Sequence, residues 1–228
     1  MTSIDQGERN KANAPDRRRL LVAACIGVVL FCAVGIFCIE GLLTFYAFAL
    51  TPLFSVPLAI ELWRQKQIRW QGGTFLVLGL TLFHFAAIQA ADKIYSQGIT
   101  YFLECGLVFN NAPSAEVKTH RECESRAAAA RRHNAPRAGL AGGITGAALS
   151  YAGLLLLGSR FRSRRKVAVM LGATFVLGLI GAAGMSLTFP DDMRSWQWIV
   201  QIYLPWQTVF ALSLVYLFGG SSTLQLRR

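Results

Sequence analysis

The chain has 228 residues, of which 54% are hydrophobic and 15% are charged, and its mean hydropathy is +0.41. A soluble domain carries roughly 25% charged residues, so this composition excludes an ordinary soluble protein. The net charge of +11 suits nucleic-acid binding at first sight, but the basic residues form short runs between long apolar stretches. Such runs are typical of membrane edges, where they attract anionic lipid headgroups, and we therefore predict a membrane protein that binds no nucleic acid.

Six apolar stretches are each long enough to cross a bilayer, because about 20 helical residues span its hydrocarbon core. The expected fold is all-α, a polytopic membrane helical bundle of about six transmembrane helices within residues 20–218, with a partly helical outer loop. The expected spans are residues 20–39, 42–62, 73–91, 139–159, 167–189 and 197–218. Residues 1–19 are polar, which predicts a disordered cytoplasmic tail, and residues 219–228 are predicted to form a second cytoplasmic tail.

The first two predicted spans are separated only by Glu40 and Gly41, inside an apolar run from Leu20 to Trp63. A single helix over this run would be about twice as long as the hydrocarbon core is thick. Glycine permits a tight reversal, and a glutamate is stable where the chain meets headgroups and water. We therefore predict a helical hairpin that reverses at the outer face, beside Glu40.

The distribution of Lys and Arg predicts the orientation, because short cytoplasmic loops collect these residues. With the N-terminus inside, the predicted inner segments carry 15 basic residues and the outer segments carry 8. We therefore expect both termini in the cytoplasm and loop 92–138 outside, in a bacterial inner membrane or a plasma membrane. Trp63 and Trp70 then lie at the inner interface and Trp196 and Trp198 at the outer one, as indole rings prefer.

The third predicted span contains His84, the only strongly polar titratable side chain at depth. An intramembrane histidine can hydrogen-bond a neighbouring helix, shuttle a proton or bind a cofactor, and we favour the first role. Together with Gln89 it forms a candidate polar intramembrane site. One histidine cannot complete a metal site, and no hydrolase elbow, HExxH or P-loop occurs, so we assign no catalytic residue, no metal and no cofactor.

The outer loop contains a second organised segment, residues 115–133, which we predict to be helical. Ser114 suits its N-cap, and Asn134 and Pro136 are expected to end it. Its charged side chains can simply be solvated, which is the simpler interpretation, or they can contact a protein partner. The candidates are Glu116, Arg121, Arg126, Arg131 and Arg132.

Two cysteines, Cys105 and Cys123, lie in the same outer loop. If this side of the membrane is oxidising, a disulfide between them would staple the loop. Sequence spacing does not measure their separation, so both the bonded and the free state stay open.

The fourth predicted span begins GLAGGITGAALSYAG. Gly139 and Gly143 form one strip of small residues, and Gly142 and Gly146 form an adjacent strip. Another backbone can approach such strips closely, and dispersion forces then replace the hydrophobic force that lipid removes. We predict that these glycines pack helices within the bundle, with the glycine-rich fifth span as the natural neighbour, rather than forming a subunit interface.

The leading functional prediction is a non-enzymatic subunit or interaction protein that docks a protein partner or a larger membrane complex. It would use the outer loop and the glycine-lined helices, because charge is scarce in the bundle while organised polarity lies outside it. One alternative is a small transporter or channel with a path near His84, since uncharged substrates need few buried charges. A third is an interfacial membrane enzyme that acts on lipid. Membrane lipids, including anionic headgroups, are expected to contact the chain in every case.

Overall fold

The computed structural model describes residues 16–37, 47–97, 114–158, 161–187 and 195–219. Over these ranges the chain is helical and contains no strand, so the predicted all-α bundle is confirmed. The helical elements in chain order are α2 (Arg17–Phe37), η1 (Ala47–Leu50), α4 (Thr51–Arg64), α5 (Trp70–Tyr95), α7 (Ser114–Leu157), α8 (Arg164–Leu187), α9 (Ser195–Trp198), η4 (Ile199–Tyr203) and α10 (Leu204–Gly219).

Five helical segments in this part of the chain are long and apolar enough to cross a membrane, which supports an integral membrane protein. They are Arg17–Phe37, Trp70–Tyr95, Ala128–Leu157, Arg164–Leu187 and Trp196–Gly219. Helix α4 is shorter, with 14 residues, but η1 precedes it directly. Together they extend roughly 29 Å, close to the thickness of the hydrocarbon core. They cover residues 47–62 of the second predicted span and continue to Arg64, while residues 42–46 of that span lie outside the described ranges.

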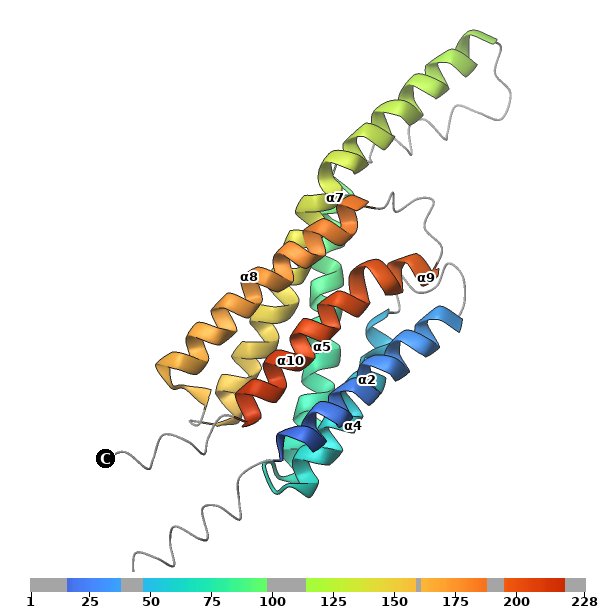
Figure 1. Cartoon of the computed structure of the whole chain (residues 1–228). Coiled ribbons are helices and arrows are strands. Elements are labelled where there is room, and N and C mark those ends of the chain that lie inside the picture. Colours follow the sequence, from blue (N-terminus) through green and yellow to red (C-terminus); the bar gives the residue numbers. More distant parts are fainter. Residues whose placement is uncertain (1–15, 38–46, 98–113, 159–160, 188–194, 220–228) are drawn as a thin grey trace, which may run out of the picture.

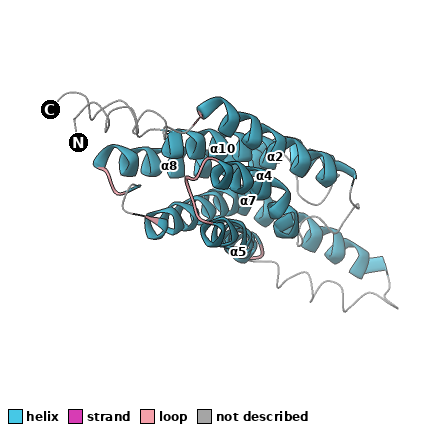
Figure 2. Ribbon diagram, turned by 90° about the horizontal axis from the view of Figure 1, so that it is seen from below, coloured by secondary structure: helices cyan, strands magenta, loops and turns pink. Residues whose placement is uncertain are grey.

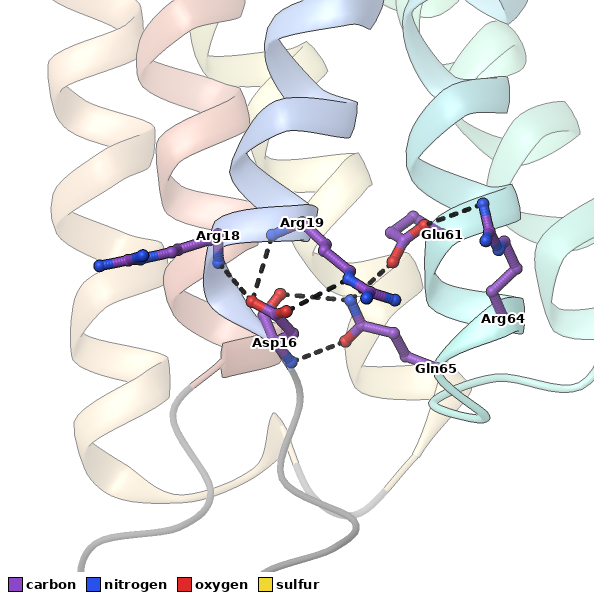
Figure 3. Close-up of polar contacts among 6 residues, drawn as sticks. All are labelled: Asp16, Arg18, Arg19, Glu61, Arg64 and Gln65. Atoms are coloured by element: carbon purple, nitrogen blue, oxygen red, sulfur yellow. Dashed lines mark hydrogen bonds and ion pairs between the residues drawn. The ribbon is translucent and has the colours of Figure 1, made fainter.

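Helices α2 and α4 run antiparallel, as the predicted hairpin requires. The backbone N–H of Asp16 donates to Oε1 of Gln65 (2.9 Å), at the opposite end of the pair from Phe37 and Ala47 (Figure 3). Nε2 of Gln65 donates to the Asp16 carbonyl (3.2 Å) and to Oε1 of Glu61 (2.9 Å). The chain therefore reverses between Phe37 and Ala47, whereas the predicted turn at Glu40 and Gly41 lies outside the described residues.

The helices form a closed ring in chain order. Each of α2, α4, α5, α7 and α8 packs against the next, and α10 packs against both α8 and α2 (Figure 2). At one end of the ring, Nε of Arg17 donates to the carbonyl oxygen of Gly219 (3.0 Å). The first and last described helices thus meet at one end of the bundle (Figure 1). We name this the inner end and the opposite one the outer end, following the predicted orientation.

Large apolar side chains fill the ring at the inner end, where α2 begins and where α4 and α10 end. Those that are almost completely buried there include Leu20, Leu58, Leu62, Phe161, Leu217 and Phe218. On the outside of the bundle, large apolar side chains such as Val29 (63% exposed) and Leu78 (64% exposed) face outwards. A surface of this kind is stable against lipid and unstable in water, which agrees with a membrane location.

Helix α7 is a single helix of 44 residues, about 66 Å long, and it continues through Pro136. The prediction that Asn134 and Pro136 end the outer helix is therefore wrong. Packing overrides the local signal, since Ala135 and Ala138 are buried against Met185 of α8. Nδ2 of Asn134 donates to the Gln97 carbonyl (2.6 Å). Figure 1 shows that α7 bends near the outer end and that its first turns project beyond the other helices, as expected of a proline inside a helix.

The glycines of α7 lie on two faces that contact two different helices. A Cβ atom on Gly139 would collide with the carbonyl oxygen of Gly181 in α8, and one on Gly143 would lie 2.5 Å from the carbonyl oxygen of Leu177. On the adjacent face, a Cβ atom on Gly142 would lie 3.1 Å from the carbonyl oxygen of Ala87 in α5. The backbones of these three helices are therefore as close as glycine permits.

The substitution Gly143→Ala tests this contact. The added methyl group would press on the Leu177 carbonyl and on Cα of Gly178 (2.9 Å), and neither backbone atom can move without separating the two helices. We expect a loss of about 1–3 kcal/mol of stability, measured by thermal unfolding in mild detergent. Gly172→Ala in α8 is the matched control, because nothing lies within 4 Å of its added Cβ atom. Equal stability of the two variants would contradict the close approach of α7 and α8.

Candidate functional site

A cavity of about 450 Å³ lies within the ring of helices. It is lined by residues from α4, α5, α7, α8, α9, η4 and α10. Ligand pockets in proteins have volumes of roughly 300–1,000 Å³, so this one is large enough for a small organic molecule. It extends from Asp92 and Ser96, which are exposed near the outer end of α5, to Phe54 and Phe210 in the middle of the bundle. The filled inner end of the ring lies beyond these phenylalanines.

The cavity exists partly because one of its walls has no side chains. Gly139, Gly142, Gly143 and Gly146 of α7 all line it, in addition to their contacts with α5 and α8. The same residues therefore bring the helices together and leave open space between them. Any larger side chain at these positions would reduce either the helix contact or the cavity.

The opposite wall contains an irregular turn, the π-helix η4 (Ile199–Tyr203). Proline at position 205 has no N–H to donate to the carbonyl of Gln201, and the N–H of Leu204 instead bonds the carbonyl of Ile199. This wider turn lies at the cavity, which Ile202 and Tyr203 line. Single π-turns of this kind are frequent at functional sites.

His84 lies in the cavity wall and joins α5 to α4. Its Nδ1 atom and Oγ1 of Thr51 share a hydrogen bond of 2.7 Å, and its ring lies edge-on to that of Tyr203, with centroids 5.4 Å apart. Both partners also line the cavity. The structure therefore gives His84 the inter-helix hydrogen bond that the sequence favoured and also places it at a binding space. Gln89 is exposed and is not among the lining residues.

Gln207 is another polar residue in the cavity wall, and the sequence analysis missed it. It is 3% exposed, and its Oε1 atom has no hydrogen-bond partner among the described residues. A buried acceptor left without a donor costs about 1–3 kcal/mol of stability. The signal in the sequence was a glutamine inside a strongly apolar last span.

Asp92 of α5 and Arg131 of α7 line the outer end of the cavity, and they are the two charged residues among its described lining. Arg131 was predicted to bind a protein partner, and Arg132, from the same set, is exposed. Glu116, Arg121 and Arg126 lie on the helix α7, but their side chains are outside the described part of the structure.

The two cysteines of the predicted disulfide also fall outside what the structure describes. Cys105 lies in the undescribed range 98–113, and Cys123 lies in α7 with its side chain not described. Within the described ranges, no group of three His, Cys, Asp or Glu side chains is placed so that it could hold a metal ion.

No known protein family, no curated protein and no solved structure matches this chain. The chemistry of the cavity is therefore the guide to function.

Thr51→Val tests the hydrogen bond that joins α4 to α5. Valine has nearly the same shape but cannot bond His84, and we expect a loss of about 1–3 kcal/mol because a buried nitrogen loses its partner. The measurement is thermal unfolding in mild detergent. Thr81→Val on α5 is the control, since its hydroxyl bonds only the Val77 carbonyl of its own helix (2.8 Å). If both variants lose the same stability, the His84 bond does not hold the helices together.

Proposed function

We propose that the protein is a small membrane carrier that takes up a small, largely apolar molecule from its outer side into the cavity. This was the alternative that the sequence left open, and the cavity beside His84 is the observation that favours it. A docking subunit has no need for a space of 450 Å³ inside its bundle, whereas a carrier requires one.

The lining indicates what kind of molecule is carried. Apart from Asp92 and Arg131 at the outer end, the described residues of the cavity wall are uncharged, and most of them are glycine, aliphatic or aromatic. A charged molecule would lose its hydration there without gaining a partner of opposite charge, at high cost. The proposed substrate is therefore uncharged and mostly apolar.

The inner end has the features of the closed side of a carrier. Large apolar side chains fill the ring there, and the two hydrogen bonds between Gln65 and the backbone of Asp16 tie the end of α4 to the start of α2 (Figure 3). Arg19 pairs with Asp16 (3.3 Å) and Arg64 with Glu61 (3.9 Å), each three residues apart in the chain, so these ion pairs do not join the two helices. The bonds between Gln65 and Asp16 are exposed, and water can replace them, so parting them to release a substrate inwards costs little.

Native mass spectrometry of the protein, purified in mild detergent from the cells that naturally produce it, tests the proposal. We expect a bound small molecule of one defined mass. Ile88→Trp should reduce its occupancy at least roughly tenfold, because Ile88 lines the cavity and the indole ring would fill part of it. Leu82→Trp, on the same helix but 63% exposed, should retain the molecule.

The proposal is wrong if no small molecule is bound, or if both tryptophan variants bind it as well as the unaltered protein does. Thermal unfolding of both variants checks that they are folded equally well.

A second candidate function, docking of a protein partner, is favoured by one observation. The first turns of α7 project beyond the rest of the bundle, where a partner on the outer side would meet them (Figure 1). The same mass spectra distinguish the candidates, since a docking subunit would carry a second polypeptide in fixed stoichiometry and an empty cavity.

A further inference from the structure

Several polar groups in the middle of the cavity wall offer little to a ligand. The hydroxyl of Ser150 donates to the Gly146 carbonyl (2.7 Å), and the hydroxyl of Thr51 is bonded to His84. Ser150 and Thr51 are also buried, each with 5% of its surface exposed. Oε1 of Gln207 is enclosed by protein atoms and cannot be reached from the cavity. A ligand is therefore recognised by other groups of the wall.

His84 offers its second ring nitrogen. Its Nδ1 atom is bonded to Oγ1 of Thr51 (2.7 Å), which has no other hydrogen bond in the described part of the chain. We assign the Thr51 hydroxyl as the donor, because donation by Nδ1 would leave the hydroxyl hydrogen without an acceptor. The proton of the neutral ring then lies on Nε2. Nε2 has accessible surface and no partner among the described residues, so His84 presents an N–H donor to the cavity.

Tyr203 and Trp206 add two further donors. The ring of Tyr203 lies edge-on to that of His84, with centroids 5.4 Å apart, so these two groups are neighbours. The hydroxyl of Tyr203 and the indole N–H of Trp206 have accessible surface and no partner among the described residues. The three side chains are half-buried, and all line the cavity. The accessible polar groups that they present can all donate a hydrogen bond.

Donors in an apolar wall are satisfied by an acceptor on the ligand. A carbonyl oxygen has two lone pairs, carries no charge and brings no hydrogen atom that needs an acceptor of its own. A hydroxyl group would bring such a hydrogen to a place where the oxygens of Thr51, Ser150 and Gln207 are buried or enclosed. A carboxylate would lie without a counter-ion, because Arg131 lines only the outer end.

We propose that the cavity binds a neutral, largely apolar molecule through a carbonyl group, whose oxygen accepts hydrogen bonds from Nε2–H of His84 and from the hydroxyl of Tyr203. This inference rests on the proposed carrier function and names the chemical class of its substrate. The Thr51 hydroxyl acts behind His84, since its bond to Nδ1 keeps the proton on the nitrogen that faces the ligand.

Equilibrium dialysis of the purified protein with fluorenone, fluorenol and fluorene tests the inference, with empty detergent micelles as background. The three probes share one flat ring system and differ at a single carbon, which carries a carbonyl, a hydroxyl or only hydrogen. We expect fluorenone to bind about 3–10-fold more tightly than fluorene and also more tightly than fluorenol. In infrared spectra, the carbonyl band of bound fluorenone should lie at a lower frequency than in a hydrocarbon solvent, as hydrogen bonding requires.

Two variants remove the donors. Tyr203→Phe removes the hydroxyl and keeps the ring, while Thr51→Val combined with His84→Phe replaces both partners of one bond by apolar groups, so that neither is left unpaired. Each change should lower the preference for fluorenone over fluorene roughly threefold and leave the binding of fluorene intact, which shows that the cavity is still formed.

Tyr216→Phe is the matched control. It removes a tyrosine hydroxyl from α10 outside the described cavity lining, so the preference for fluorenone should stay unchanged. Comparison of each variant with this control cancels the partition of the probes into the detergent.

Equal affinity of the unaltered protein for fluorenone and fluorene would overturn the inference, and so would tighter binding of fluorenol than of fluorenone. A preference for fluorenone that neither donor variant lowers would overturn it as well. Each of these results leaves the carrier proposal standing as long as the bound molecule found by mass spectrometry is lost in Ile88→Trp. Retention of that molecule in Ile88→Trp contradicts the carrier proposal itself.

Discussion

The close approach of α7 to its two neighbours is the contact on which the rest of the structure depends. Gly139 and Gly143 place the backbone of α7 directly on α8, and Gly142 and Gly146 place it on α5. In lipid, where burial of apolar surface brings no gain, such backbone contacts and the dispersion forces between them are what hold helices together. Helix α7 lies between α5 and α8 in the ring, so its glycines determine how closely these two helices approach it and how the ring closes.

The same glycines explain why a bundle of this size contains a cavity. A helix face without side chains contacts its neighbours at its edges but leaves space in front of it, and the wide turn η4 and Pro205 shape the opposite wall. At the inner end, large side chains such as Phe161 and Phe218 fill the ring. The four glycines of α7 that line the cavity do not extend to that end. Packing density thus changes along the bundle, from filled at the inner end to hollow towards the outer end.

The helical spans could be predicted because a bilayer demands about 20 apolar residues for each crossing, a demand visible in composition alone. The two glycine strips could also be recognised, since a spacing of four residues aligns them on a helix. The end of the outer helix at Pro136 could not be predicted correctly, because the burial of Ala135 and Ala138 against α8 outweighs the local preference of proline. Gln207 was missed because it is set apart by an amide oxygen without a partner among the described residues, and this depends on neighbours that only the fold supplies.

The central claim is that a cavity accessible from the outer side reaches the middle of this bundle. Its most direct test is the reaction of a cysteine placed at Ser150, a buried residue that lines the cavity, in a chain from which the native cysteines have been removed. A small, uncharged thiol reagent should label Ser150→Cys but not Ser213→Cys, which is buried outside the cavity lining. Equal labelling of the two cysteines, or no labelling of Ser150→Cys, would contradict the account.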